Sequence, residues 1–273
     1  MNSNPTVSIV VPTKNEGDDL EYTIHHLLAN SSSHEFEIIV IDDLSSDGSG
    51  ADAAIRYVSH PAVTVVRAEE WLGIGGARRL GASLAQGDVI AQVDSHTFCP
   101  DGWLAPLVEP LRWADVAVVQ ATIRPFEIPI AACGIHATSR VSLDAIGGYD
   151  DGMLPPFGGE QEELSIRAWL MGYRVMSVPG CEVWHKYRDS AAGNPVPYEM
   201  PLYSRYHNYL RVALLHFSWE RIGETVKHYM GKPEFDRTFE ELMLSDVLER
   251  RQWLESMRVR DDDWWVSKFG VTL

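Results

Sequence analysis

The 273-residue sequence contains few cysteines. The three it has, Cys99, Cys133 and Cys181, are odd in number, lie far apart and form no CxxC pair. This spacing argues against a disulfide framework and against a cysteine zinc site. We therefore expect buried free thiols in a reducing compartment.

Basic residues are also scarce, with 23 Lys and Arg against 39 Asp and Glu and a formal net charge of −16. An acidic surface repels phosphate backbones and anionic lipids, which argues against nucleic-acid partners and against polybasic docking to a membrane. A phosphate-bearing ligand would then be held by a metal ion, or by a few local arginines and backbone N–H groups.

Long hydrophobic runs are missing as well. No apolar run is long enough to span a bilayer, and the chain has no basic-then-apolar start. We expect no integral membrane segment and a soluble, cytoplasmic protein. The composition, 45% hydrophobic and 23% charged, is that of an ordinary globular protein. The length suits one large α/β domain, or one domain with a helical appendage.

Strand-like and helix-like segments alternate over the first hundred residues. Strands are predicted over 7–11, 37–41, 63–66 and 88–93, and helices over about 17–29, 51–57 and 75–85. This alternation predicts βαβ units and a mostly parallel sheet, with ligands at the carboxyl ends of the strands.

The pattern changes after about residue 101 to mixed strands and loops, with a helix over about 161–171. A Gly- and Pro-containing stretch, 189–197, predicts a mobile connection. From about residue 203 the chain is helical and rich in aromatic residues. We therefore divide it into an α/β domain, 1–202, and a helical extension, 203–273, packed on the same domain.

Two polar clusters follow predicted strands. Asp42 and Asp43 end the second strand, where carboxylates can accept hydrogen bonds from a base or ribose; the alternative is that Asp43 shapes the turn or caps a helix. Gly73, Gly75 and Gly76 open a helix whose free N–H groups would admit a phosphate, with Arg78 or Arg79 adding charge. No Gly-Lys-Ser/Thr follows, so this is not a Walker loop.

A third cluster is Asp94-Ser95-His96, at the end of an apolar strand. Residues two apart on an extended segment face the same way, so both side chains can reach one ion. An Asp oxygen with an imidazole suits a transition metal such as Mn²⁺ better than Ca²⁺. His185 would supply a third ligand. The alternatives are an Asp that caps a turn and two histidines without a metal.

A fourth cluster lies between Gly147 and His185 and contains Phe157-Gly158-Gly159-Glu160-Gln161. In the predicted helix that follows, Glu163 and Arg167 are four residues apart, which we interpret as a surface ion pair.

Taken in order, these segments resemble the family 2-like glycosyltransferases of the GT-A fold. The likeness is closest to the catalytic domain of polypeptide N-acetylgalactosaminyltransferases and covers roughly residues 6–215. Asp94-Ser95-His96 is similar to their Asp-x-His metal motif, Phe157-Gly158-Gly159-Glu160 to their Trp-Gly-Gly-Glu, and the segment from Val183 to Arg188 to the one that carries their third metal ligand. Its other carriers are the runs Val7-Ser8-Ile9-Val10-Val11-Pro12-Thr13-Lys14-Asn15-Glu16, Glu37-Ile38-Ile39-Val40-Ile41-Asp42-Asp43 and Gly87-Asp88-Val89-Ile90, with Pro197-Tyr198 and His207-Asn208-Tyr209-Leu210-Arg211 further on.

The resemblance implies a GT-A, Rossmann-like nucleotide-sugar-binding domain with a C-terminal helical extension. It further implies a UDP-sugar donor and Mn²⁺, with Mg²⁺ as an alternative, held by Asp94, His96 and His185. Asp43 would contact the uridine, and Arg78 would lie near the nucleotide. Glu160 would bind sugar hydroxyls, and the loop after His185 would close over the donor. The other implied donor-binding residues are Pro12, Asn15, Glu16, Ser95, Phe157, Gly159, Arg188 and Tyr198.

One position bears on the mechanism. Inverting relatives commonly have Glu-Asp where this chain has Glu160-Gln161, and their Asp is the general base. The amide of Gln161 cannot take a proton from an acceptor hydroxyl, which favours a retaining outcome, with Glu162 or Glu163 as alternative bases. We assign Glu160, Gln161 and Asp94 to the catalytic set. The replacements at Phe157 and Gln161 leave the sugar, a hexose or N-acetylhexosamine, and the peptide or small-molecule acceptor open.

Other functions stay in competition. They are an inverting family 2-type transferase, a GDP-mannose-using retaining transferase, a sugar nucleotidyltransferase and a non-catalytic nucleotide-sugar-binding module. The nucleotidyltransferase usually needs a basic Gly-rich loop after the first strand, where this chain has Pro12-Thr13-Lys14-Asn15-Glu16. The helical extension would form core, an acceptor wall or a homodimer interface, and aromatic residues at helical spacing favour core. We interpret Asp261, Asp262 and Asp263 as a solvated turn.

Overall fold

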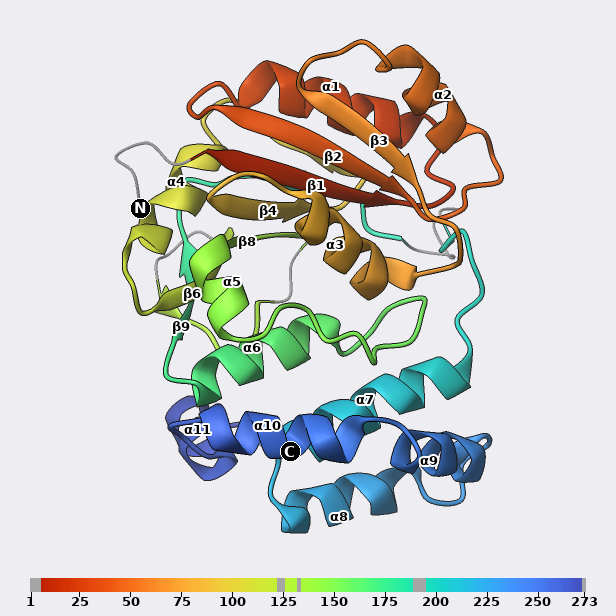
Figure 1. The fold of residues 1–273 in the computed structure, drawn as a ribbon, viewed down its shortest axis with the longest axis vertical. Helices are drawn as coiled ribbons and strands as arrows, with labels where there is room; N and C mark the ends of the chain where they lie inside the picture. Colours follow the sequence, from red (N-terminus) through yellow and green to blue (C-terminus); the bar gives the residue numbers. More distant parts are fainter. Residues whose placement is uncertain (1–5, 122–125, 132–133, 189–194, 272–273) are drawn as a thin grey trace.

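The computed structural model of the chain describes residues 6–121, 126–131, 134–188 and 195–271. Within these ranges an eight-stranded sheet forms the centre, in the order β3-β2-β1-β4-β8-β6-β9-β7 (Figure 1). The strands are β1 (Val7–Thr13), β2 (Phe36–Asp42), β3 (Val63–Arg67), β4 (Val89–Val93), β6 (Val116–Ala121), β7 (Phe126–Glu127), β8 (Ile135–Ser139) and β9 (Arg174–Val178).

Strands β3, β2, β1 and β4 run parallel to one another, as do β6 and β9. β8 is antiparallel to both β4 and β6, and β7 is antiparallel to β9. The predicted mostly parallel sheet is therefore confirmed. Because β1, β2 and β4 point the same way, the residues that follow them meet at one edge of the sheet.

Helices cover both faces of the sheet. Ile9 and Val11 of β1 pack with Ile24 on one face, whereas Val10 packs with Ala77 on the other, as the two-residue period of a strand requires. The predicted helices of the first hundred residues are present with shifts of one or two residues at their ends. Up to residue 170, the helices are α1 (Asp18–Asn30), α2 (Ser49–Arg56), α3 (Gly73–Leu84), α4 (Leu104–Val108), a 3₁₀ helix (Glu109–Arg112), α5 (Arg140–Ala145) and α6 (Glu160–Leu170).

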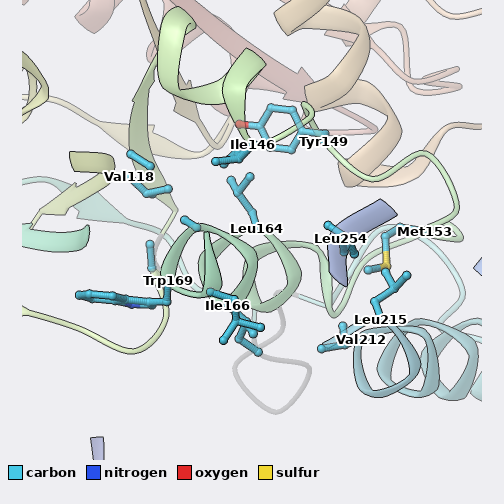
Figure 2. Packing of buried hydrophobic residues seen from close by; sticks show 14 of the residues in the cluster. Val118, Ile146, Tyr149, Met153, Leu164, Ile166, Trp169, Val212, Leu215 and Leu254 are labelled. Atoms are coloured by element: carbon cyan, nitrogen blue, oxygen red, sulfur yellow. The ribbon is translucent and has the colours of Figure 1, made fainter. Parts of the chain in front are cut away.

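The helical extension packs below α6 (Figure 1). Its helices are α7 (Leu202–His216), α8 (Trp219–Tyr229), α9 (Phe235–Met243), α10 (Val247–Met257) and α11 (Asp262–Phe269). One hydrophobic cluster runs from Val118 of the sheet through Leu164 and Trp169 of α6 to Val212 and Leu254 of the extension (Figure 2). The extension therefore completes the core beneath α6.

One sequence interpretation in this region is wrong, and a second holds only in part. Glu163 and Arg167 form a buried pair, not a surface pair, because α7 packs on that face of α6. Of the three aspartates near residue 262, Asp261 and Asp263 are exposed, and Asp261 caps α11 by accepting from Trp264 N. Asp262, in contrast, is buried against Arg221 and belongs to the packing between helices.

Three other expectations concern the cysteines, the mobile connection and membrane spans. Cys99 is a buried free thiol, and burial raises its pKa. Cys181 is buried as well. Cys133 and residues 189–194 of the predicted mobile connection lie outside the described residues. In the described ranges, every helix is too short or too polar to span a bilayer.

Candidate active site

A group of potential metal ligands lies where β4 ends. Ligand atoms of Asp94, His96 and His185 all fall within 4.8 Å of one another. Asp94 and His96 come directly from β4, but His185 arrives from 90 residues away through a short antiparallel ladder. In that ladder β10 (Trp184–His185) pairs with β5 (Thr97–Phe98), so that His185 lies opposite Thr97.

Close packing keeps the three side chains together. His185 Nε2 lies 3.2 Å from Asp94 Oδ2, and the His96 and His185 ring centroids are 4.6 Å apart. Gly134, whose carbonyl accepts from Asp94 N, leaves no room for a side chain: a Cβ there would lie 2.3 Å from His185 Cδ2. The residue type at position 134 therefore bears on the geometry of the ligand set.

The donor set fits a divalent transition metal. It combines one carboxylate oxygen with two imidazole nitrogens, and all three side chains are partly accessible, at 14–17%. His185 Nδ1 is buried without a hydrogen-bond partner, which is unusual for a ring nitrogen in a finished core. Elsewhere in the described ranges no other group of three His, Cys, Asp or Glu side chains meets the same criterion.

Electrostatics keep Asp94 in the form that binds a cation. Burial alone would raise its pKa, but the hydrogen bond to His185 and the charge of Arg78 outweigh burial and hold the pKa below its usual range.

Arg78 connects the metal ligands to the start of α6. Its guanidinium, 2% exposed, donates from Nη2 to Asp94 Oδ1 at 3.0 Å and from Nη1 to Glu160 Oε1 at 3.4 Å. Glu160 Oε2 in turn accepts from Gly158 N at 2.7 Å. Arg78 Nε has no partner. Asp94, Arg78 and Glu160 are thus one network, with spare hydrogen-bonding capacity at its centre.

The glycine-rich start of α3 does not offer the free amides that the sequence predicts. Asp43 Oδ1 accepts from Leu72 N and its Oδ2 from Gly73 N, at 2.7 and 2.9 Å, and Ile74 N donates to Pro156 O. Asp43 is buried, and burial raises its pKa against the lowering effect of these bonds. Its carboxylate therefore fixes the loop before α3. This agrees with the alternative that Asp43 caps a helix, but the helix is α3 and not the one that follows Asp43 in the sequence. Gly73 has φ +66° and packs against Pro155 too closely for any Cβ.

A pocket opens between the ends of β1, β2 and β4. Among the residues predicted to bind the donor, those that line it are Pro12, Glu16, Asp43, Asp94, Ser95, His96 and Tyr198. Sequence reasoning missed Lys14 and Trp71 as pocket residues. Lys14 Nζ donates to Asp43 O at 2.6 Å and lies 5.7 Å from the Trp71 ring centroid. The position of Lys14 directly after β1 could have indicated a pocket residue, because ligands are expected where the parallel strands end. Nothing in the sequence indicates that Trp71 lies at the pocket.

Two other predicted residues, Asn15 and Arg188, are not among those that line the pocket. The side-chain carbonyl of Asn15, a residue with φ 55°, accepts from Ser46 N and Asp47 N and so holds the loop after β2. Glu16 pairs with Arg188 and lies 3.2 Å from His96 Nδ1.

Phe157 and Tyr198 have ring centroids 6.4 Å apart, edge to face. Gly159 packs against Asn208. Burial and the nearby charge of Glu16 raise the pKa of Tyr198, so this residue is a neutral phenol at the pocket.

The two alternative general bases are not equivalent. Glu163 is 1% exposed and locked between Arg167 and His216, whose attraction outweighs burial and lowers its pKa to about 2. Glu162 has a raised pKa because of burial, and it lines a different cleft together with Tyr209. Gln161 is in the first turn of α6, beside Glu160.

Comparison with known proteins agrees with this arrangement. Residues 8–141 match the family model "Glycosyl transferase family 2". Polypeptide N-acetylgalactosaminyltransferase 10 of Homo sapiens is 29% identical over 318 residues, an alignment that covers 98% of this chain and 50% of the human protein. The chain therefore spans about half the length of this relative.

Solved structures share the fold. A crystal structure of GalNAc-T7 with UDP, GalNAc and Mn²⁺ superimposes with a TM-score of 0.79 at 22% identity, covering 98% of this chain and 57% of the other. The mannosyltransferase PcManGT from Pyrobaculum calidifontis, in complex with GDP-Man and Mn²⁺, gives a TM-score of 0.60 at 19% identity, covering 93% and 75%. Together with the sequence matches, these likenesses show that the chain carries a glycosyl transferase family 2 domain built on the GT-A fold.

Proposed function

We propose that this protein is a metal-dependent retaining glycosyltransferase. It would move a hexose or N-acetylhexosamine from a UDP-sugar to a hydroxyl of a peptide or small-molecule acceptor. The observation that carries the proposal is the convergence of Asp94, His96 and His185. Asp94 and His96 line the pocket that also contains Asp43, and Arg78 links Asp94 to Glu160.

The residues divide the donor between them. Asp94, His96 and His185 would hold Mn²⁺ next to the diphosphate, and the metal supplies Lewis-acid stabilisation of the departing diphosphate, worth several kcal/mol. The nucleoside would lie along Lys14, Asp43 and Trp71, which line the pocket beyond β1 and β2.

The sugar half of the donor would lie towards α6. Glu160, fixed by Arg78 and Gly158 N, presents a carboxylate that can accept hydrogen bonds from sugar hydroxyls. Such bonds orient the anomeric carbon, and positioning of this kind is a large part of the rate enhancement in group transfer. Phe157 and Tyr198 would exclude water beside the sugar.

Retention is supported by the lack of a suitable base among the carboxylates of the first turn of α6. Gln161 is an amide, and the carboxylate of Glu160 is bound by Arg78 and Gly158 N. Glu163 is paired with Arg167 and His216, and Glu162 lines the other cleft. With no side chain there to deprotonate the acceptor, a donor phosphate oxygen would take its proton, and the acceptor would enter on the face that the diphosphate leaves.

Ligand-dependent unfolding tests the donor class. UDP, GDP and Mn²⁺ would be added singly and in pairs to the wild type and to Asp94→Ala, with Asp115→Ala as control because Asp115 pairs with Arg174 at the surface. At a hundred times its dissociation constant, UDP with Mn²⁺ should add about 2.7 kcal/mol to the unfolding free energy. Asp94→Ala should abolish this gain, and EDTA should remove it from the wild type.

The alternatives predict other outcomes. Stabilisation by GDP instead of UDP would point to a mannosyl-type donor, and no response to either nucleotide would overturn the proposal. The anomeric configuration of the product, read by NMR, separates retention from inversion. We also propose a cytoplasmic location, supported by the buried free thiol of Cys99.

A further inference from the structure

A loop between α5 and α6, residues 150–159, forms the sugar side of the pocket, and α7 of the helical extension holds it. The loop includes Pro156, which lines the pocket, and Gly158, whose N–H donates to Glu160. On one side it contacts α3 through the hydrogen bond from Ile74 N to Pro156 O. On the other side its contacts come from Asn208 and Arg211.

Asn208 binds the loop backbone with both ends of its amide. Its Oδ1 accepts from Leu154 N and its Nδ2 donates to Leu154 O, both at 2.8 Å, and the residue is 1% exposed. A primary amide of this length offers an acceptor and a donor side by side, one to the N–H and one to the C=O of the same residue. The backbone of Asn208 also lies against Gly159, where a Cβ would be 3.2 Å from Asn208 Cβ.

Arg211, one turn further along α7, fixes the start of the same loop. It makes a two-pronged ion pair with Asp150, at 2.6 and 2.9 Å, and it also pairs with Asp246 in front of α10. Gly152 lies directly on the guanidinium, because a Cβ there would be 2.0 Å from Arg211 Cζ. The loop is therefore anchored at residues 150 and 154 before it reaches the pocket.

A path made of hydrogen bonds and of the chain between Leu154 and Gly158 then leads from α7 to the metal ligand Asp94. From Leu154 the chain runs to Gly158, whose N–H fixes Glu160, and Glu160 is joined by Arg78 to Asp94. The nucleotide half of the pocket is built differently, from the ends of β1, β2 and β4. A change at Asn208 should therefore reach the sugar and spare the nucleotide.

We propose that Asn208 is a positioning residue that sets the place of the sugar-binding wall, Pro156 to Glu160, through its amide pair with Leu154. The inference rests on the proposed function. Arg211 supports the same loop from Asp150, so the helical extension takes part in sugar recognition although it lies outside the nucleotide pocket.

The test uses Asn208→Asp, which keeps the size and the acceptor but loses the donor, and Asn208→Ser, which stays uncharged. The matched control is Arg251→Met. Arg251 is also buried and also holds backbone carbonyls, those of Leu214 and Phe217, but it has no contact with the loop. Each protein is measured for thermal stability, UDP affinity with Mn²⁺, and UDP release from UDP-GalNAc and UDP-GlcNAc.

Both Asn208 variants should release UDP from the nucleotide sugar at least about tenfold more slowly, since small misplacements cost this much or more, while the UDP dissociation constant stays within about twofold. Arg251→Met should lower stability and leave turnover per folded protein unchanged. Loss of stability alone in the Asn208 variants, or an equal loss of UDP affinity, would overturn the inference. A wild type that does not bind UDP with Mn²⁺ would instead overturn the proposed function, and this inference with it.

Discussion

Helix α6 contributes to two buried arginine–carboxylate networks, and they differ in how completely their polar atoms are satisfied. Glu160, its first residue, belongs to the network of Arg78 and Asp94 at the pocket. Glu163, three residues later, belongs to the network of Arg167 and His216 against α7.

The network of Glu163, Arg167 and His216, which we call the inner network, is closed, because its polar atoms already have partners. Arg167 donates to both carboxylate oxygens of Glu163, at 2.9 and 2.7 Å, and to Ile146 O at 2.5 Å, while His216 lies 3.0 Å from Glu163 Oε1. All three charged or titratable side chains are at most 2% exposed. Such a network specifies how two helices pack and leaves nothing for a ligand to bind.

The network of Glu160, Arg78 and Asp94, which we call the pocket network, is open, because some of its hydrogen-bonding capacity is unused. Its arginine is as buried as Arg167, but Arg78 Nε has no partner and the bond to Glu160 is long, at 3.4 Å. Its two carboxylates are 14% and 12% exposed, and Asp94 lines the pocket. Spare donors beside accessible carboxylates are typical of a ligand site, since a buried polar group without a partner is otherwise costly.

The largest expected effect comes from breaking the inner network. Glu163→Gln removes the charge that compensates Arg167, and an uncompensated buried charge costs about 3–5 kcal/mol of unfolding free energy. Urea unfolding would measure this cost. Glu21→Gln is the matched control, because Glu21 forms an exposed pair with Arg56, and it should cost less than about 1 kcal/mol.

A second variant keeps this prediction testable if Glu163→Gln does not fold. Glu163→Leu combined with Arg167→Met removes both charges and should recover most of the stability, since apolar replacements of a buried pair are often neutral. A cost below about 1 kcal/mol for Glu163→Gln alone would show that the network is not the structural one.

The next largest effect is expected from acid, which should protonate Glu163 and break its ion pair with Arg167. The ion pair with Arg167 and the bond to His216 lower the pKa of Glu163 to about 2, against the opposing effect of burial. The unfolded chain, with an ordinary pKa near 4.5, therefore binds this proton more readily than the folded one. Stability from Glu163 is complete above pH 4.5 and is lost as the pH falls towards 2, by about 3 kcal/mol in total.

Unfolding in urea at pH 5, 4 and 3 measures this slope. The Glu163→Leu, Arg167→Met double variant lacks the carboxyl and should show a shallower dependence over that range. Parallel curves for the wild type and the double variant would mean that Glu163 has an ordinary pKa in the folded protein.

The sequence could predict the regular part of the fold, because the strand at 38–41 is a short run of β-branched apolar residues and the helix at 17–29 carries a helical period. It could also place Asp43 and Asp94 at the same edge of the sheet, since parallel strands end together. What it could not supply is the β5–β10 ladder that brings His185 to Asp94, because two residues show no period. For that ligand the resemblance, and not the pattern, gave the prediction.

The sequence could not predict which of these side chains are buried or which backbone groups they contact. An i,i+4 pair such as Glu163 and Arg167 looks the same in the sequence whether it faces water or another helix. Here the pair is buried because α7, about forty residues later in the chain, packs on it. In the same way nothing local shows that Asp43 would accept from the amides of Leu72 and Gly73. Contacts of this kind depend on the tertiary fold.

The smallest expected change in stability, and the sharpest test of the comparison, is Arg78→Met. Although Arg78 is as buried as Arg167, its removal should cost only about 1–2 kcal/mol, since water and cations can reach Asp94 and Glu160 from the pocket. Losing a positive charge 3.0 Å from Asp94 should also tighten Mn²⁺ binding in the absence of nucleotide, by at least about threefold, while UDP-sugar turnover falls.

Calorimetric titration with Mn²⁺ measures the first effect, and Arg79→Met is the matched control. Arg79 is the next residue on α3 but is 45% exposed and lies 3.6 Å from Asp151, so its removal should change neither metal affinity nor turnover. Weaker Mn²⁺ binding in Arg78→Met would mean that the arginine holds Asp94 in place for the metal instead of competing with it. The pocket network would then be as closed as the inner one, and the contrast between the two networks of α6 would no longer mark the site.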